Sequence, residues 1–391
     1  YPVDPLFWLT VSGNLAYSLT ASNSDARNLP YPPHTGYNYG VSVGEQVFAW
    51  GANKAGADTS KLQQMIAQRQ YADAFRVLAG SLRSQYLALI TSRMALKNER
   101  EQLALQRSSL DLKEQMLKAG NISGAEISGA RLAFQTTQLD TDRAEYDFEN
   151  ARTVFRRLAG LPSFPEEAVP SALPSPAYQP AVADALLGNL MRDGGITETL
   201  QGQEYALYLK QQDLAYKVAK TRLYPKFYFS GGYSLSYDVP LAQSYTTYSA
   251  SLSAGWTIFD GFATRGAKLS ALANRRSYEQ QLRRFTDTTL DNAQGMRKQL
   301  ALQARALDLA ETRRALARDG LAHTQEEFKS GTVSQFDVDA ARAGFNQADY
   351  AAVIMRMTYL NRWSEFVSLT GNDPLQGEIP ANYRNLATHG Q

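Results

Sequence analysis

The sequence contains no cysteine among its 391 residues and only three histidines. The absence of cysteine excludes a disulfide scaffold, a cysteine-ligated metal site and a thiol enzyme. His34, His323 and His389 share no metal-ligand spacing, so we expect no metal site and no other cofactor. Neither a Gly-rich phosphate loop nor a G-x-S-x-G element occurs, and we therefore predict no catalytic residues and no enzyme activity.

An excess of charge of one sign is also lacking. Lys and Arg number 40 against 38 Asp and Glu, which gives no electrostatic reason to expect a nucleic acid as partner. No apolar run approaches the roughly 18–20 residues that cross a bilayer as a helix. The sequence begins at Tyr1 without Met or a hydrophobic leader, and we expect this to be a trimmed or mature end.

Proline is missing from two long intervals. None of the 15 prolines lies between Pro33 and Pro162 or between Pro240 and Pro374. Because proline removes a backbone donor and clashes inside a helix, these intervals predict long helices. Six prolines gather instead within residues 161–180, which is typical of an extended linker.

The two long units on either side of this linker are copies of one another. A shift of 211 residues aligns them without a gap from Ser42 to Gly160. The identical residues include Lys118, Gly120, Ser123, Phe155 and Leu158, which fall on Lys329, Gly331, Ser334, Phe366 and Leu369. Repeats of this size are supersecondary units that pack against one another. We therefore divide the chain into repeat 1 (1–160), a Pro-rich linker (161–180), repeat 2 (181–373) and a C-terminal tail (374–391).

Each repeat contains two segments in which apolar and small polar residues alternate, at 7–19 and 37–48 and again at 227–237 and 245–259. Period two predicts β-strands with one apolar and one polar face. A transmembrane strand needs about 9–11 residues and aromatic girdles, and these segments meet both conditions. The alternative is a water-soluble β-sandwich, for which the rest of the chain offers no facing sheet.

Four strands are too few to close a barrel. An open edge cannot face lipid, because its backbone groups would have no hydrogen-bond partner. Bacterial barrels have about eight strands or more. If these strands lie in a membrane, several chains must contribute to one barrel, and three chains would supply twelve strands.

A Pro-free stretch of 67 residues follows each strand pair, at 52–118 and 263–329. As one unbroken helix it would be about 100 Å long. Apolar residues such as Phe75, Leu78 and Leu82 recur along one stripe, so we expect these helices to belong to a coiled coil or a helical barrel.

Return helices are predicted at 123–159 and 334–370, and a further, interrupted helix at 182–223. By repeat symmetry we expect an equivalent of this last helix, roughly forty residues long, before Tyr1.

The turns between long and return helices carry termination and capping signals. Glycine supplies a left-handed position that ends a helix, lysine favours the negative end of the helix dipole, and serine caps the next helix. The residues concerned are Lys118, Gly120, Asn121, Ile122 and Ser123 in the first turn and Lys329, Gly331, Thr332, Val333 and Ser334 in the second.

With this architecture the chain resembles the TolC-like outer membrane factor (outer membrane efflux protein) family over nearly its whole length. Ile258-Phe259-Asp260-Gly261 is similar to the family's strand exit, and Gly331–Val338 followed by Ala341 is similar to its helical turn. The sequence departs from the pattern at Phe262, which replaces the final glycine of the strand exit. The first copy of the exit reads Phe48-Ala49-Trp50-Gly51.

The resemblance implies a mixed α and β membrane protein that forms a homotrimer. Each chain would give four antiparallel strands to a 12-stranded β-barrel and long helices to a periplasmic α-helical barrel. The barrel would lie in outer-membrane lipid of a Gram-negative-type cell, with the helices in the periplasm. The function implied is a passive exit duct of a tripartite efflux or type I secretion system, for drugs, small molecules or proteins. Its partners would be a periplasmic adaptor (membrane fusion) protein and an inner-membrane pump.

The resemblance also assigns roles to the turns. They would form the tunnel tip and dock the adaptor, whereas the residues alone require only that they turn the chain. Asp337 matches an acidic position that rings the closed tip in the family, and Glu126 is its counterpart in repeat 1. Both also have capping-box spacing from a serine, so each carboxylate is either a gate residue or a helix cap. Ala340 and Val333 depart from other gate positions of the family, so any gate here is built differently.

A second hypothesis is a periplasmic coiled-coil adaptor or scaffold whose strands form a small soluble domain without a membrane barrel. Such adaptors have one helical hairpin, whereas this sequence predicts two hairpins and two strand pairs with lipid-type patterning. The export channel is therefore the preferred interpretation.

Overall fold

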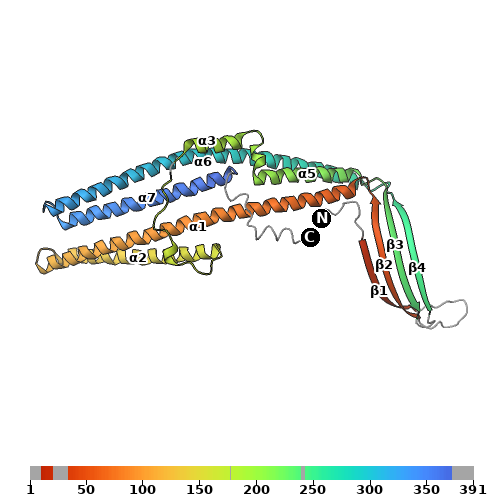
Figure 1. The fold of residues 1–391 in the computed structure, drawn as a ribbon, viewed down its shortest axis with the longest axis horizontal. Helices are drawn as coiled ribbons and strands as arrows, with labels where there is room; N and C mark the ends of the chain where they lie inside the picture. Colours follow the sequence, from red (N-terminus) through yellow and green to blue (C-terminus); the bar gives the residue numbers. More distant parts are fainter. Residues whose placement is uncertain (1–9, 21–33, 177, 239–242, 372–391) are drawn as a thin grey trace. The chain divides into compact units, whose positions relative to one another are not determined.

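The structure, a computed structural model, describes residues 10–20, 34–176, 178–238 and 243–371. The start of the predicted strand 7–19, the predicted tail 374–391 and His389 lie outside the described residues. The described residues are mostly helical and form four strands, which Figure 1 labels β1 to β4. In chain order the elements are β1 (Thr10–Thr20), β2 (His34–Phe48), α1 (Ala52–Lys118), α2 (Gly124–Leu158), the 3-10 helix η1 (Glu166–Ala168), α3 (Pro180–Met191), α4 (Gly195–Glu198), α5 (Leu200–Lys220), β3 (Lys226–Asp238), β4 (Gln243–Gly255), α6 (Ala263–Lys329) and α7 (Gln335–Leu369).

The chain folds into two compact units, and each takes residues from both halves of the sequence. The first unit comprises Tyr1–Gln68 and Glu204–Arg284, and the second comprises Arg69–Gln203 and Phe285–Gln391. The division in space therefore does not follow the predicted division into repeat 1 and repeat 2. Equivalent segments of the two halves lie in the same unit.

The first unit contains an antiparallel sheet with the strand order β1-β2-β3-β4 (Figure 1). Its register pairs Leu15 with Tyr39, Tyr39 with Leu235, and Tyr233 with Tyr248. Because side chains alternate between faces along a strand, this register puts the apolar series of β2, β3 and β4 on one face. The sheet ends on β1 at one edge and on β4 at the other.

No described residue covers either face of strands β2, β3 and β4. None of the described residues of β2, β3 and β4 is buried, and Tyr248 and Leu252 are 79% and 72% exposed. The described part of the unit thus contains no second layer over the apolar face, in contrast to a soluble β-sandwich. The opposite face carries small polar side chains, and Ser230 and Ser251 share a hydrogen bond of 2.7 Å across it.

Strand β4 is displaced from the predicted range 245–259 and ends at Gly255. Gly255 pairs with Lys226, the first residue of β3. The preceding Pro225 has no backbone N–H to extend the ladder. The chain beyond Gly255 is instead fixed by Trp256, whose Nε1 donates to the carbonyl oxygen of Leu223 at 3.1 Å.

The predicted interrupted helix 182–223 is observed as three helices, α3, α4 and α5, and the last of them ends at Lys220. Gly194 adopts φ +82, and a Cβ on Gly195 would lie 2.3 Å from the carbonyl oxygen of Asn189, so the chain turns too tightly there for a continuous helix. At the other end, Tyr224 precedes Pro225, and a residue before proline is disfavoured in the helical region.

The second unit is built from two helical hairpins with matching cores. Leu89 and Leu96 of α1 pack with Phe148 and Phe155 of α2. The residues 211 positions later form the core of the other hairpin: Leu300, Leu307, Tyr359 and Phe366. Burial of large apolar side chains at these repeated positions stabilises each helix pair.

The Pro-rich linker and α3 complete the two cores. Val169 and Leu173 of the linker pack in the α1–α2 core, and Ala183 of α3 packs in the α6–α7 core. Asp184 of α3 accepts hydrogen bonds of 2.6 and 3.0 Å from Arg297 of α6. Among the described residues, no helix combines the length and apolar character that a membrane crossing requires.

Two helical glycines predict opposite effects of the same substitution. A Cβ at Gly202 would lie 2.0 Å from the carbonyl oxygen of Ile196, whereas one at Gly188 would meet nothing within 4 Å. We expect Gly202→Ala to lower the free energy of unfolding by about 1–3 kcal/mol through steric overlap. Gly188→Ala should raise it by about 0.5–1 kcal/mol, because alanine favours helix more than glycine does. Denaturant unfolding followed by circular dichroism measures both, and a stable Gly202→Ala variant would contradict the close approach.

Candidate hairpin-tip site

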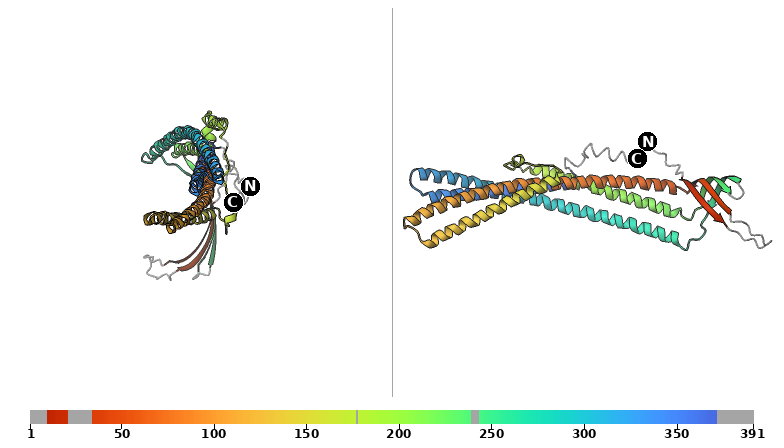
Figure 2. Two further views of the ribbon diagram at one scale, coloured as in Figure 1. Left: turned by 90° about the vertical axis from the view of Figure 1, so that its left-hand side faces the viewer. Right: turned by 90° about the horizontal axis from the view of Figure 1, so that it is seen from below.

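The two hairpin turns lie at the same end of the second unit (Figures 1 and 2). Gly120 and Gly331 both adopt φ +78. In the first turn the N–H of Gly120 donates to Leu117 O at 2.9 Å, and the N–H of Asn121 donates to Met116 O at 2.8 Å. This pair of bonds is a Schellman motif, which satisfies carbonyl groups left free at the helix end and requires the left-handed residue.

The second turn repeats this geometry. The N–H of Gly331 donates to Phe328 O and that of Thr332 to Glu327 O, each at 3.0 Å. Of the predicted docking residues, Ile122 and Val333 are half-buried; the exposed ones are Lys118, Gly120, Asn121, Ser123, Lys329, Gly331, Thr332 and Ser334. The same residues therefore turn the chain and present a polar surface.

A complete capping box follows each turn. Glu126 Oε2 accepts from the backbone N–H of Ser123 at 2.7 Å, and Asp337 Oδ2 accepts from that of Ser334 at 2.8 Å. In return, each serine hydroxyl accepts from the backbone N–H of the acid. The structure thus places both predicted acidic residues in the capping geometry that their spacing indicated.

Hydrogen bonding lowers the pKa of both carboxyl groups. The side-chain and backbone hydrogen bonds from Ser334 lower the pKa of Asp337, and the backbone and side-chain bonds from Ser123 lower that of Glu126. Bonds to the charged form have this effect, so the stabilisation by each cap is present above the ordinary pKa and is lost as pH falls through the lowered one. Both groups are carboxylates at neutral pH, and a cap does not remove their negative charge.

One cation–π contact links the two hairpins near their tips. Lys113 of α1 places its Nζ 6.0 Å from the ring centre of Phe336 in α7. Behind this contact a groove of about 470 Å³ lies between the hairpins. Its lining includes Glu101, Leu105 and Ser108 of α1 and Gln335, Asp339 and Arg342 of α7.

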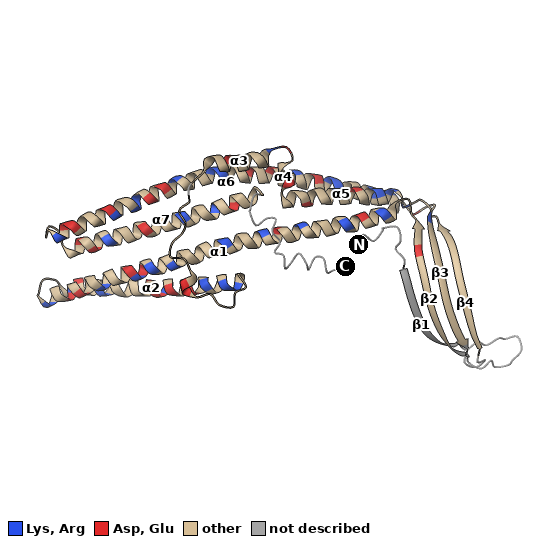
Figure 3. Ribbon diagram, viewed as in Figure 1, with Lys and Arg blue, Asp and Glu red and all other residues tan. Residues whose placement is uncertain are grey.

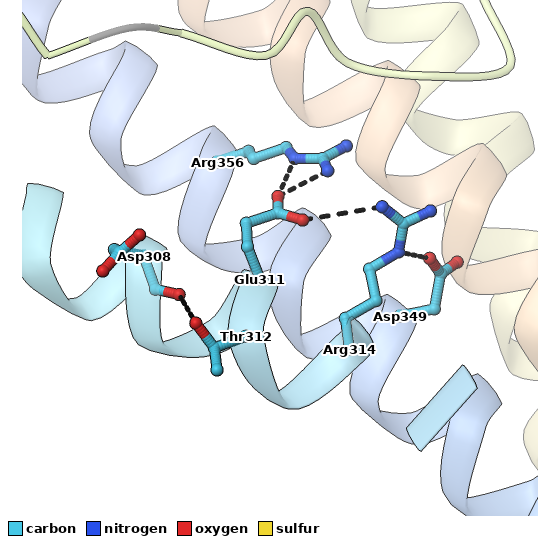
Figure 4. A network of polar contacts seen from close by, with 6 residues as sticks. All are labelled: Asp308, Glu311, Thr312, Arg314, Asp349 and Arg356. Atoms are coloured by element: carbon cyan, nitrogen blue, oxygen red, sulfur yellow. Dashed lines mark hydrogen bonds and ion pairs between the residues drawn. The ribbon is translucent and has the colours of Figure 1, made fainter. Parts of the chain in front are cut away.

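A polar network joins α6 to α7 farther along the hairpin (Figure 4). Glu311 of α6 binds Arg356 of α7 and lies 3.5 Å from Arg314, one turn along α6. Arg314 donates to Asp349 of α7 at 2.5 Å. The Arg356 side chain is only 11% exposed, so its charge depends on Glu311 for a partner.

The equivalent pair in the other hairpin has the opposite polarity. Arg100 and Glu145, which lie 211 positions before Glu311 and Arg356, form an ion pair of 3.2 Å with side chains 53% and 56% exposed. The long helix thus carries the cation in one hairpin and the anion in the other. The sequence-based reasoning missed this network, although the same shift of 211 would have revealed the reversed charges.

The described residues contain no group of three or more His, Cys, Asp or Glu that could hold a metal ion. Asp260, at the strand exit, accepts from the backbone N–H and hydroxyl of Thr264 at 2.8 and 2.5 Å. These hydrogen bonds lower the pKa of Asp260, and they engage its carboxylate within the turn that precedes α6.

A comparison with protein families matches the outer membrane efflux protein family over residues 13–161 and 202–372. The chain belongs to this family. The resemblance inferred from the sequence is therefore confirmed, and the protein is an outer-membrane efflux channel component. No curated protein sequence matches the chain.

Solved structures of outer-membrane proteins share this fold. The outer membrane channel CmeC of Campylobacter jejuni matches with a TM-score of 0.74 and 14% identity, covering 98% of this chain and 82% of that one. VceC of Vibrio cholerae gives a TM-score of 0.69 at 14% identity and 93% and 87% coverage. The open-state MtrE channel of Neisseria gonorrhoeae gives 0.66 at 14% identity and 94% and 81% coverage. CmeC and MtrE are outer membrane channels, and VceC is an outer membrane protein.

The reversed ion pairs generate a charge-swap prediction for this channel protein. Glu311→Arg should lower the free energy of unfolding by about 2 kcal/mol, because it removes a charged hydrogen bond and faces Arg356 with a like charge. The double variant Glu311→Arg/Arg356→Glu should recover most of this loss, since it reproduces the polarity of Arg100 and Glu145. The matched swap of that exposed pair should change stability by less than about 1 kcal/mol. Thermal unfolding measures all three, and a double variant as unstable as the single would contradict the pairing.

Proposed function

We propose that three copies of this chain form one passive duct through the outer membrane. In this proposal each chain gives four strands to a 12-stranded β-barrel and its two hairpins to a periplasmic α-helical barrel. The observation that carries the proposal is a four-stranded sheet whose strands β2, β3 and β4 share an apolar face with no covering layer, and whose edge strands β1 and β4 pair with no further strand, among the described residues.

The open edges support assembly between chains. The backbone groups along the outer side of β1 and β4 need hydrogen-bond partners, and in lipid water cannot supply them. Antiparallel pairing of β4 of one chain with β1 of the next satisfies both edges and closes the barrel after three chains. The apolar face then meets lipid, and the Ser, Gly and Thr face lines the lumen.

The duplicated hairpins support a helical barrel built on an internal two-fold repeat. Helices α1 and α6 each have 67 residues, and α2 and α7 each have 35. Their bounds, cores and capping boxes recur at one offset. Six such hairpins from three chains would give twelve helices around the duct.

The exposed turns support docking of a periplasmic adaptor protein at the tip. Both turns have a rigid backbone, fixed by the Schellman motifs and capping boxes, and the groove between the hairpins lies beside them. Through this adaptor an inner-membrane pump would drive the transport of drugs, small molecules or proteins in a tripartite system. The channel itself would neither consume energy nor form chemical bonds.

Asp337 is proposed to act as both cap and gate charge. Its carboxylate is exposed, and its cap bonds keep it ionised at neutral pH. Three copies around a three-fold axis would concentrate negative charge and bind cations at the tip. Glu126 has the same geometry in the other hairpin and is a second candidate.

The barrel proposal predicts a difference between the two faces of β4. Tyr248→Arg puts a cation on the apolar face, which at the middle of a bilayer costs about 2–4 kcal/mol. Thr247→Arg puts the same residue on the polar face, where water would solvate it. In mild detergent we expect wild type and Thr247→Arg to form trimers of the 43.3 kDa chain, and Tyr248→Arg to form fewer trimers. Light scattering measures the mass of each. Equal behaviour of the two variants, or a detergent-free wild-type monomer, would contradict the barrel.

The gate proposal predicts a charge effect at Asp337. Asp337→Asn should weaken the block of single-channel current by multivalent cations in planar bilayers, because three negative charges leave the ring. Wild-type block should also weaken as pH falls through the lowered pKa of Asp337. Asp339→Asn, one half-turn along α7, is the control and should alter block less. Unchanged block in Asp337→Asn would leave this residue as a helix cap only.

A further inference from the structure

Two aromatic residues occupy strained backbone positions where the sheet meets the helices. Trp50 adopts φ 54 and Phe262 adopts φ 65, and they alone among the described non-glycine residues have positive φ. Each sits beside a glycine, Gly51 or Gly261, that also has positive φ. Glycine would hold this conformation without strain, whereas a bulky side chain is disfavoured there. Trp50 and Phe262 therefore occupy their positions at a cost in backbone strain, and strain of this kind is typical of residues with a functional role.

These rings belong to a group that we call the aromatic collar. Trp50 donates from Nε1 to the carbonyl oxygen of Pro225 at 2.7 Å and contacts Tyr224 edge-on, with ring centres 5.3 Å apart. Phe262 contacts Phe259 edge-on at 5.6 Å, and the two rings are 67% and 72% exposed. The collar comprises Phe48, Trp50, Tyr224, Trp256, Phe259 and Phe262. Exposed rings with a polar tip tied to the backbone suit the boundary between lipid chains and water.

Basic residues appear abruptly at the same junction. The range 210–226 contains five Lys and Arg against one Asp, and 260–276 contains four against one. In contrast, strands β2, β3 and β4 in Figure 3 are almost free of charge, whereas the end of α5 next to them is blue. The one Asp of 210–226, Asp213, is already paired with Arg275 at 2.8 Å.

We call five cations near the collar the basic belt; four come from these two ranges and the fifth, Lys54, lies at the start of α1, and none of the five forms an ion pair with a described residue. They stand within a few residues of the collar in sequence and all but Lys226, which is half-buried, are exposed. The members of the belt are Lys54, Lys217, Lys220, Lys226 and Arg265. The Nζ of Lys220 lies 4.5 Å from the ring centre of Tyr216, a contact that leaves its charge without an anionic partner. Lys and Arg without an ion pair next to a lipid-facing segment attract anionic headgroups.

We infer that the aromatic collar and the basic belt together bind anionic phospholipids of the leaflet that borders the helices. The rings would lie at the acyl–headgroup boundary, and the lysine and arginine side chains would contact the headgroup phosphates. This inference rests on the proposed function, because it takes the sheet to lie in lipid. It adds a preference for lipid charge, which a barrel alone does not require.

Native mass spectrometry of the detergent-purified trimer tests the preference. Phosphatidylglycerol and phosphatidylcholine with identical acyl chains serve as probes. Wild type should retain phosphatidylglycerol about tenfold better than phosphatidylcholine. The free-energy difference behind a tenfold ratio is little more than the attraction between one basic residue and an anionic membrane surface. The preference should decline at high salt. Equal retention of the two lipids by wild type would overturn the inference.

Matched variants locate the effect. Changing the five belt residues to Gln should abolish the preference. A control that changes Arg107, Lys113, Lys118, Arg313 and Lys329 to Gln removes the same charge from the hairpins and should keep it. Loss of the preference in both would overturn the assignment to the junction.

If the belt variant does not assemble, Phe262→Gly tests the collar instead. This variant should keep or raise the thermal stability of the protein in detergent. It should also lose part of the stabilisation that added phosphatidylglycerol gives to wild type. Unchanged lipid stabilisation in this variant would contradict the role of the ring.

A separate reporter distinguishes failure of the inference from failure of the proposed function. Tyr248→Trp places an indole on the apolar face of β4, and lipids brominated on their acyl chains should quench its fluorescence. Quenching together with equal binding of both phospholipids would reject only the headgroup preference. Absence of quenching would reject the membrane barrel itself.

Discussion

The requirement that every backbone hydrogen-bonding group have a partner in lipid is the constraint on which the architecture depends. A water-soluble sheet can leave its edges to solvent, and it covers its apolar face with a second layer. The sheet in this chain has two open edges and an apolar face without such a layer in its described part. Both features are unfavourable for an isolated chain, and both are resolved at once when identical sheets join edge to edge around a lumen. Oligomerisation then completes the fold and creates the pore in the same step.

Much of this architecture could be predicted from the sequence because its signals are local and strong. The Pro-free stretches coincide with α1 and α6, and the Gly and Ser positions mark the turns that the structure shows. Errors arose where tertiary contacts decide. The end of β4 depends on where its neighbour β3 begins, which residue type over a short window does not encode. The interruption within the predicted helix 182–223, by contrast, was predicted from the sequence, and the structure shows it between α3 and α4.

The candidate site was only partly predictable for the same reason. Capping-box spacing identified Glu126 and Asp337, whose partners are three residues away. The network around Glu311 joins residues up to 45 positions apart, so no local pattern indicates it. Comparison of the two copies of the hairpin does indicate it, because Arg100 and Glu145 stand at the equivalent positions with charges reversed.

The duplicated hairpins show which properties the fold conserves and which it leaves free to differ. Their cores occupy equivalent positions because buried apolar packing fixes how the long and return helices meet. The ion pairs keep their positions but exchange polarity, since attraction between two helices is the same in either order. The two hairpins of the chain therefore share the positions of their cores but differ in the order of their charges. In a ring of identical chains the two kinds of hairpin would alternate simply because each chain contributes one of each. The reversed ion pairs lie inside the hairpins, so they can differ without any change in the helical framework.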